Sequence, residues 1–219
     1  MPNVAFFPLP GRQLKYLTPS NVAACNLSNM TCCISSIMGS RDDALTEQQF
    51  EQLLSACNSK HPRERLVLLL AGDLGMREGE IAHMNRKWLN FPKGHIVIPS
   101  NDRDWSPKTR WGARTIPAAS MSRRAWEATR DYFTAFEALG VHRATVYRTV
   151  ERIASRSGLK SRIYPHALRA TAATRLAYKV RNPQILCDLF GWGDIKIGQY
   201  YIRRGGGLAE EELEKALGP

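Results

Sequence analysis

The chain has 219 residues, of which 31 are Lys or Arg and 20 are Asp or Glu, so its formal net charge is +11. This length suits one globular domain with a modest appendage, and an apolar fraction of 43% suits a folded, water-soluble protein. The basic charge indicates an acidic partner, with nucleic acid the commonest kind and a membrane surface the second. No segment holds the roughly 18 apolar residues of a bilayer-spanning helix, and no stretch has the form of a signal peptide. We therefore expect a cytoplasmic protein.

The cysteines and histidines do not indicate a metal site. The chain has five cysteines, an odd number, and none of them forms a CxxC pair. Free thiols in a reducing cytosol are the simplest interpretation. The five histidines are scattered, and none lies beside paired cysteines. We expect no bound metal and no cofactor.

The N-terminal part of the chain separates into a poorly patterned arm and a helical region. Residues 1–44 show no clean period, which predicts an arm with little regular structure. Thr46 and Gln49 form a capping box, and the apolar residues after them recur at helical spacing. Pro62 opens a second predicted helix over 62–71, and a short helix is expected over 78–84.

The period then changes to that of short strands. We expect three strands, over 88–91, 95–99 and 113–117, and the Pro-Lys-Gly sequence at 92–94 supplies the first turn. A longer loop, 100–112, joins the second and third strands. The fold class predicted is therefore mainly α, with a small three-stranded antiparallel sheet inserted near the middle.

Helices resume after Ser120 and continue to residue 204. Two of the predicted helices cover 143–157 and 166–180. A third begins at Asn182 and Pro183 and ends at Phe190, and a last short helix, capped by Asp194, holds Tyr200 and Tyr201. Beyond it, residues 205–219 form a tail with an acidic amphipathic segment. This tail could dock on a neighbouring subunit or pack on its own chain.

The polar residues of this region match what cleavage of a DNA phosphodiester without a metal requires. Negative charge grows on the phosphate in the transition state, so preorganised cations must meet it. Arginine suits this task because its planar fork grips two oxygens and stays protonated. A nucleophile must attack, and the leaving 5′ oxygen must receive a proton. The parts to look for are two arginines, a His or Lys, and a hydroxyl group.

Five segments carry these parts, and their order identifies a family resemblance. In chain order they are the box Gly75–Glu80 with Arg77, the loop residue Lys108, the HxxR box His166–Arg169, the Leu189–Trp192 segment, and Tyr201, nine residues beyond Trp192. None of these is specific alone. Together, across residues 45–204, they resemble the catalytic domain of the tyrosine recombinases, the phage integrase family.

The resemblance implies a fold like that of type IB topoisomerases and a defined set of roles. It implies site-specific strand exchange through a covalent 3′-phosphotyrosine, without metal or ATP. The implied roles are these: Arg77 and Arg169 clamp the phosphate, His166 assists proton transfer, Lys108 protonates the leaving 5′ oxygen, Trp192 stabilises the transition state, and Tyr201 attacks.

Several of these assignments have rivals in the sequence. Tyr200 competes with Tyr201, and because neighbours on a helix differ by about 100° in direction, only one can face the phosphate; the family spacing selects Tyr201. Glu80 is either an exposed ion-pair partner of Arg77 or a buried residue that orients it, and we expect the second. Lys108 has three cationic rivals nearby, namely Arg103, Arg110 and Arg114.

The same resemblance bears on partners and domains. We expect double-stranded DNA as the partner, self-association into a dimer or tetramer on it, and association with the nucleoid. The predicted domains are an arm over 1–44, shorter than the core-binding domain of relatives, a catalytic domain over 45–204, and a tail over 205–219. Two other functions stay open: a DNA-binding protein that has lost catalysis, and a relaxing type IB topoisomerase or hairpin-forming resolvase with the same chemistry.

Overall fold

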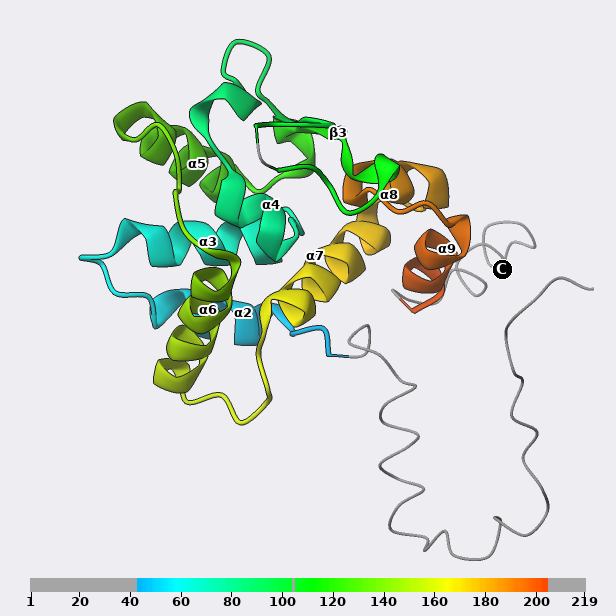
Figure 1. Cartoon of the computed structure of the whole chain (residues 1–219). Coiled ribbons are helices and arrows are strands. Elements are labelled where there is room, and N and C mark those ends of the chain that lie inside the picture. The colour runs from blue at the N-terminus through cyan, green and yellow to red at the C-terminus, as the bar shows by residue number, and fades with distance from the viewer. Residues whose placement is uncertain (1–42, 104, 205–219) are drawn as a thin grey trace, which may run out of the picture. The chain divides into compact units, whose positions relative to one another are not determined.

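The computed structural model describes residues 43–103 and 105–204 (Figure 1). The predicted arm and tail lie outside these residues, apart from Asp43 and Ala44. The helices and strands are α2 Glu47–Ser55, α3 Pro62–Gly72, α4 Glu78–His83, β1 Leu89–Asn90, β2 His95–Ile98, β3 Arg114–Pro117, α5 Arg123–Ala135, α6 Arg143–Ser157, α7 Pro165–Lys179, α8 Pro183–Phe190 and α9 Ile195–Arg204. The predicted class, mainly helical with one small sheet, is confirmed.

The sheet is antiparallel with strand order β1-β2-β3. In its register Ile96 lies opposite Ile116, so β2 and β3 present apolar residues to the same side, and both are fully buried. The predicted first strand, 88–91, was too long. Trp88 instead closes the 3₁₀ turn Arg86–Trp88, since its backbone N–H donates to the Asn85 carbonyl at 3.1 Å, and its indole N–H donates to Asp102 Oδ2 at 2.7 Å.

Local signals in the sequence set most helix boundaries. The Thr46 hydroxyl accepts the Gln49 backbone N–H at 3.2 Å, while the Gln49 side chain accepts the Thr46 N–H at 2.9 Å. Asn182 caps α8 through two backbone N–H groups, and Asp194 accepts the Lys196 N–H at 2.9 Å at the start of α9. These predicted caps are confirmed.

Helix α7 lies between two packed groups of helices (Figure 1). On one side α3, whose central leucines are buried, packs against α7 and supplies much of the larger core. On the other side α8 and α9 pack against an alanine-rich face of α7, and small side chains let the helices approach closely. The predicted site residues come from α7 itself and from the elements on both sides of it. Among the described residues, no helix is long and apolar enough to cross a membrane.

Candidate active site

Arg77 stands at the N-cap of α4 and is held from two directions. Its Nη1 donates to Glu80 Oε1 at 2.9 Å, and its Nη2 donates to the carbonyl oxygen of Gly191 at 2.7 Å. The backbone N–H of Arg77 donates to the other Glu80 oxygen at 2.8 Å. The side chain keeps 30% of its surface exposed. Arg77 is therefore fixed in direction yet accessible to an anion from solvent.

Glu80 is the buried centre of this arrangement, with only 2% of its side chain exposed. Arg114 grips both carboxylate oxygens, with Nη1 at 2.7 Å and Nη2 at 2.9 Å. Burial by itself would raise the pKa of Glu80. The hydrogen bond and charge of Arg114 and the charges of Arg169 and Arg77 outweigh burial and lower this pKa to about 2. Glu80 is thus ionised at neutral pH, and the expectation that it is a buried orienter is confirmed.

Arg169 lies on α7 and is buried against the turn before α4 and the end of α8. Its Nη1 donates to the carbonyl oxygen of Gly75, and its Nη2 donates to that of Phe190. Burial, followed by the charge of Arg77, lowers the pKa of Arg169 from its ordinary value. The guanidinium groups of Arg77 and Arg169 repel each other where little water screens them, and an anion bound close to both would relieve this repulsion.

Three aromatic rings stack beside Arg169. Phe190 and Trp192 are parallel with ring centroids 4.7 Å apart, and Trp192 and Tyr201 are parallel at 5.2 Å. The Arg169 guanidinium carbon lies 5.8 Å from the centroid of the Trp192 ring. Trp192 thereby links the buried arginine to the tyrosine on α9.

The two adjacent tyrosines differ in their surroundings. Tyr201 is 5% exposed and stacks flat on Trp192, whereas Tyr200 is half-buried and meets Tyr201 edge-on, with centroids 5.4 Å apart. The charge that Tyr201 would carry when ionised also stabilises the cationic form of Arg169. Of the two tyrosines, it is therefore Tyr201 that interacts with Arg169.

Lys108 and His166 differ from this buried group in being exposed. Lys108 is exposed in the β2–β3 connection, and His166 is exposed in the first turn of α7, three residues before Arg169. The geometry thus unites Arg77, Arg169 and Tyr201 with Trp192. The roles of Lys108 and His166 still rest on their sequence positions.

Arg114 is the member of the site that the sequence did not reveal. From its position in the sequence Arg114 is, like Arg103 and Arg110, a rival of Lys108, but its side chain is only 4% exposed and offers almost no surface to DNA. Besides Glu80, it donates through Nε to the Leu189 carbonyl at 2.7 Å. A signal was present, because Arg114 shares a strand face with buried Ile116 and so points inward.

A second ionic cluster supports the turn that carries Arg77. Asp73, at the end of α3, is buried and accepts hydrogen bonds from Arg175 and from the Ser122 hydroxyl, the latter at 2.5 Å. Arg175 also donates to the Gly72 carbonyl at 2.9 Å. Helix α7 therefore grips the α3–α4 turn at Gly72 through Arg175 and at Gly75 through Arg169.

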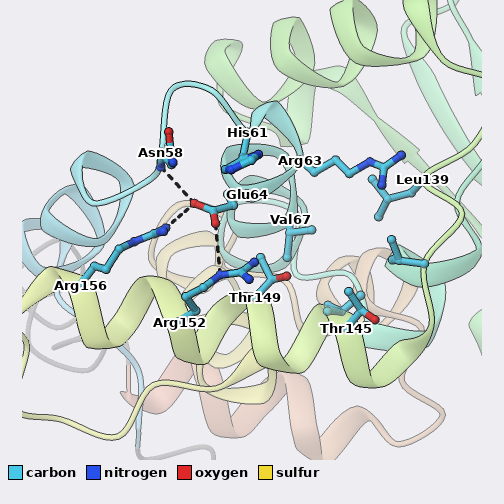
Figure 2. Close-up of a pocket in the computed structure, with 12 residues that line it drawn as sticks. Asn58, His61, Arg63, Glu64, Val67, Leu139, Thr145, Thr149, Arg152 and Arg156 are labelled. Carbon is cyan, nitrogen blue, oxygen red and sulfur yellow. Dashed lines mark hydrogen bonds and ion pairs between the residues drawn. The ribbon is translucent and has the colours of Figure 1, made fainter.

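A cavity of about 330 Å³ lies elsewhere, between the start of α3 and α6 (Figure 2). Its walls are largely apolar, with Val67 and Leu139 among them, and the buried Glu64 is neutralised there by Arg152 and Arg156. None of the residues proposed for catalysis lines this cavity. It is not part of the candidate active site.

Comparison with known proteins provides separate evidence on the family of the chain. The model of the phage integrase family matches residues 43–205. A tyrosine recombinase of Pseudothermotoga lettingae is 26% identical over 168 residues, which is 73% of this chain and 56% of that protein. Tyrosine recombinase XerA of Pyrococcus furiosus is 23% identical over 184 residues, covering 79% and 61%. The chain thus spans less than two thirds of the length of these relatives.

Solved structures of the same kind share the fold. A crystal structure of XerA recombinase superposes with a TM-score of 0.61 at 16% identity, covering 80% of this chain and 63% of that one. The Tn1549 transposon integrase, in complex with transposon right end DNA, gives a TM-score of 0.61 at 21% identity, covering 80% and 66%. With the family model matched over most of its length, the chain belongs to the phage integrase family.

Proposed function

We propose that this chain is a site-specific DNA recombinase that cleaves and rejoins DNA through a 3′-phosphotyrosine on Tyr201. One observation carries the proposal: Tyr201 is buried and stacked on Trp192, and it lies close enough to Arg169 for their charges to interact. A scissile phosphate bound there would meet both the cation that stabilises its growing charge and the nucleophile that attacks it.

Arg77 and Arg169 would form the phosphate clamp. Carbonyl groups of Gly191, Gly75 and Phe190 hold the two guanidinium groups in advance, so little reorganisation is needed as charge develops on the phosphate oxygens. Glu80 keeps Arg77 in place from behind. An interaction of this preorganised kind is worth about 3 to 4 kcal/mol per donor in comparable sites.

The chemical step would exchange one phosphodiester bond for another, so that the energy of the DNA bond is kept in the link to the protein. The Tyr201 oxygen forms a bond to phosphorus while the bond between phosphorus and the 5′ oxygen breaks. The phenol proton passes to His166, and Lys108 gives a proton to the leaving 5′ oxygen. Trp192 packs beneath the tyrosine and, with one N–H and no acceptor, does not carry protons. Rejoining reverses each transfer, so the proposed reaction needs neither metal nor ATP.

Double-stranded DNA is the proposed partner. The formal net charge of +11 favours phosphate contacts, which position a protein without reading sequence. Among the structural neighbours, the XerH recombinase is bound to difH substrate and the Tn1549 integrase to transposon DNA. Exchange of strands between two sites needs several active sites, so we propose a dimer or tetramer on DNA, in the cytoplasm at the nucleoid.

A suicide substrate tests this proposal. Nicked duplexes are made from the DNA that flanks the gene for this chain, so that cleavage releases a short fragment and traps the protein on the DNA. We expect an adduct with the wild type and with Tyr200→Phe, and none with Tyr201→Phe. An adduct that survives in Tyr201→Phe would refute the assignment. Binding without any adduct would leave a DNA-binding protein only, and sequence-independent plasmid relaxation would indicate a topoisomerase.

A further inference from the structure

We propose that Trp111 is a positioning residue that docks the Lys108 loop onto the turn between α8 and α9. This inference rests on the proposed role of Lys108 as the acid for the leaving 5′ oxygen. Trp111 lies in a 3₁₀ turn, Arg110–Gly112, just before β3. Its side chain is 49% exposed, yet one side of it is closely covered.

The covered side faces the turn that carries Trp192. A Cβ atom added at Gly193 would lie 2.5 Å from Cδ1 and Nε1 of Trp111, so the indole ring rests directly on that glycine. A Cβ atom at Gly191 would lie 2.6 Å from the Trp111 carbonyl oxygen. Ring and backbone of one loop residue thus meet both glycines that flank Trp192, and only the absence of side chains there permits the contact.

The loop is also anchored at its other stem. Trp105 stacks on His83, with ring centroids 5.6 Å apart, and lies 5.0 Å from Trp88. Asp102 fixes this stem by accepting the Trp88 indole N–H at 2.7 Å. Lys108 lies midway along the chain between Trp105 and Trp111. The loop is therefore attached to α4 at one end and to the α8–α9 turn at the other.

The two ends of the loop contact each other on either side of Lys108 in the chain. A Cβ atom at Gly112 would lie 2.3 Å from Pro107 Cβ, so the residues on either side of the loop tip are in contact. Beyond Trp111, Arg114 bonds to Leu189 and Glu80. The β2–β3 connection reaches α8 in Figure 1. These contacts hold the chain on both sides of Lys108.

A consequence follows for one chemical step. Without the Trp111 ring, the Lys108 loop keeps the Trp105 stem but loses its docking on Gly193, and Lys108 spends less time near the 5′ oxygen. The hydrogen bonds printed for the Arg77 and Arg169 side chains run to Glu80 and to backbone carbonyl groups and do not involve the Trp111 ring. The defect should therefore be confined to protonation of the leaving group.

A substrate with sulfur in place of the bridging 5′ oxygen isolates that step. A thiolate leaves without a proton, so a variant that lacks only the acid regains cleavage on it. We expect Trp111→Ala to cleave the oxygen substrate about 10- to 100-fold more slowly than wild type and the sulfur substrate at nearly the wild-type rate. Lys108→Ala should behave in the same way, and DNA affinity should be unchanged in both.

Three further variants separate docking from general damage. Trp111→Phe keeps a ring over Gly193 and should restore most of the rate. Gly193→Ala pushes the ring away and should lower the rate in wild type but add little to Trp111→Ala, because both remove the same contact. Phe136→Ala removes another half-exposed aromatic ring, at the C-cap of α5, and should leave cleavage unchanged.

Two outcomes would overturn the inference, and they differ from each other. If sulfur rescues Lys108→Ala but not Trp111→Ala, Trp111 acts on something other than the acid, and only its positioning role fails. If sulfur rescues neither variant, Lys108 is not the acid, and that part of the proposed function fails with it. Thermal unfolding of each variant shows whether a lost rate reflects lost folding.

Discussion

Replacing Glu80 with Gln removes the charge that holds Arg77 and Arg114 together while nearly preserving side-chain volume. The pKa of Glu80 is about 2 against an ordinary value of 4.5. Each pH unit between these values corresponds to about 1.4 kcal/mol, so the ionised carboxylate contributes about 3 kcal/mol to folding. Removal of one partner from a buried ion pair costs a similar amount, about 3 to 5 kcal/mol. We predict that Glu80→Gln lowers the free energy of unfolding by about 3 kcal/mol at neutral pH.

The pH dependence gives this prediction a second test. Because folding lowers the pKa of Glu80, its contribution is fully present above the unfolded value of 4.5 and is lost as pH falls toward 2. The unfolding free energy of the wild type should therefore decline through this window more steeply than that of Glu80→Gln. At low pH the two proteins should converge.

Urea unfolding followed by tryptophan fluorescence at a series of pH values measures both effects. Glu51→Gln is the matched control, since it removes an exposed carboxylate that also pairs with an arginine, Arg124. Exposed pairs of this kind are worth about 0 to 1 kcal/mol. Equal stabilities of Glu80→Gln and Glu51→Gln, or equal pH slopes of Glu80→Gln and wild type, would refute the reasoning.

Three other predictions concern the turns and the partner. Gly191→Ala should lower the free energy of unfolding by about 2 kcal/mol or more, because φ is +64° and the added Cβ would meet the Trp111 carbonyl oxygen. Gly158→Ala, where φ is +72° but the space is open, should lower it by about 1 kcal/mol. Urea unfolding compares the two variants, and equal losses would contradict the packing of Gly191 on Trp111. Asp73→Asn leaves Arg175 without its buried counter-charge and should lose about 3 kcal/mol by the same assay; a loss below that of Glu51→Gln would count against the cluster. DNA affinity should fall steeply with salt, with a log–log slope near −0.9 per phosphate contact; a flat dependence, measured by fluorescence anisotropy, would contradict the phosphate-binding surface.

The features that the sequence predicted well are local ones. The caps at Thr46, Asn182 and Asp194 depend on residues two or three positions apart, and each is present in the structure. The choice of Tyr201 over Tyr200 as the nucleophile also rests on local spacing along one helix after Trp192, and it stays a prediction. Local hydrogen bonds and helical periodicity can be predicted from the sequence because they depend on residues that are close together in the chain.

The features that the sequence missed depend on contacts between distant segments. The alternation of the predicted strand 113–117 indicates that Arg114 points inward, but nothing near it in the chain shows that Glu80 comes to lie against it. The predicted first strand is too long, because its first residue, Trp88, belongs to a 3₁₀ turn and bonds through its indole N–H to the distant Asp102. The seat of Trp111 on Gly193 joins two parts of the chain that share no local pattern.

The most direct test of the proposed chemistry is to identify the residue that becomes linked to DNA. The covalent complex trapped on a suicide substrate is digested with protease and nuclease, and the peptide that retains a nucleotide is sequenced by mass spectrometry. We predict a nucleotide joined through its 3′ phosphate to Tyr201. Attachment to Tyr200 or another residue, or linkage through a 5′ phosphate, would contradict the proposal.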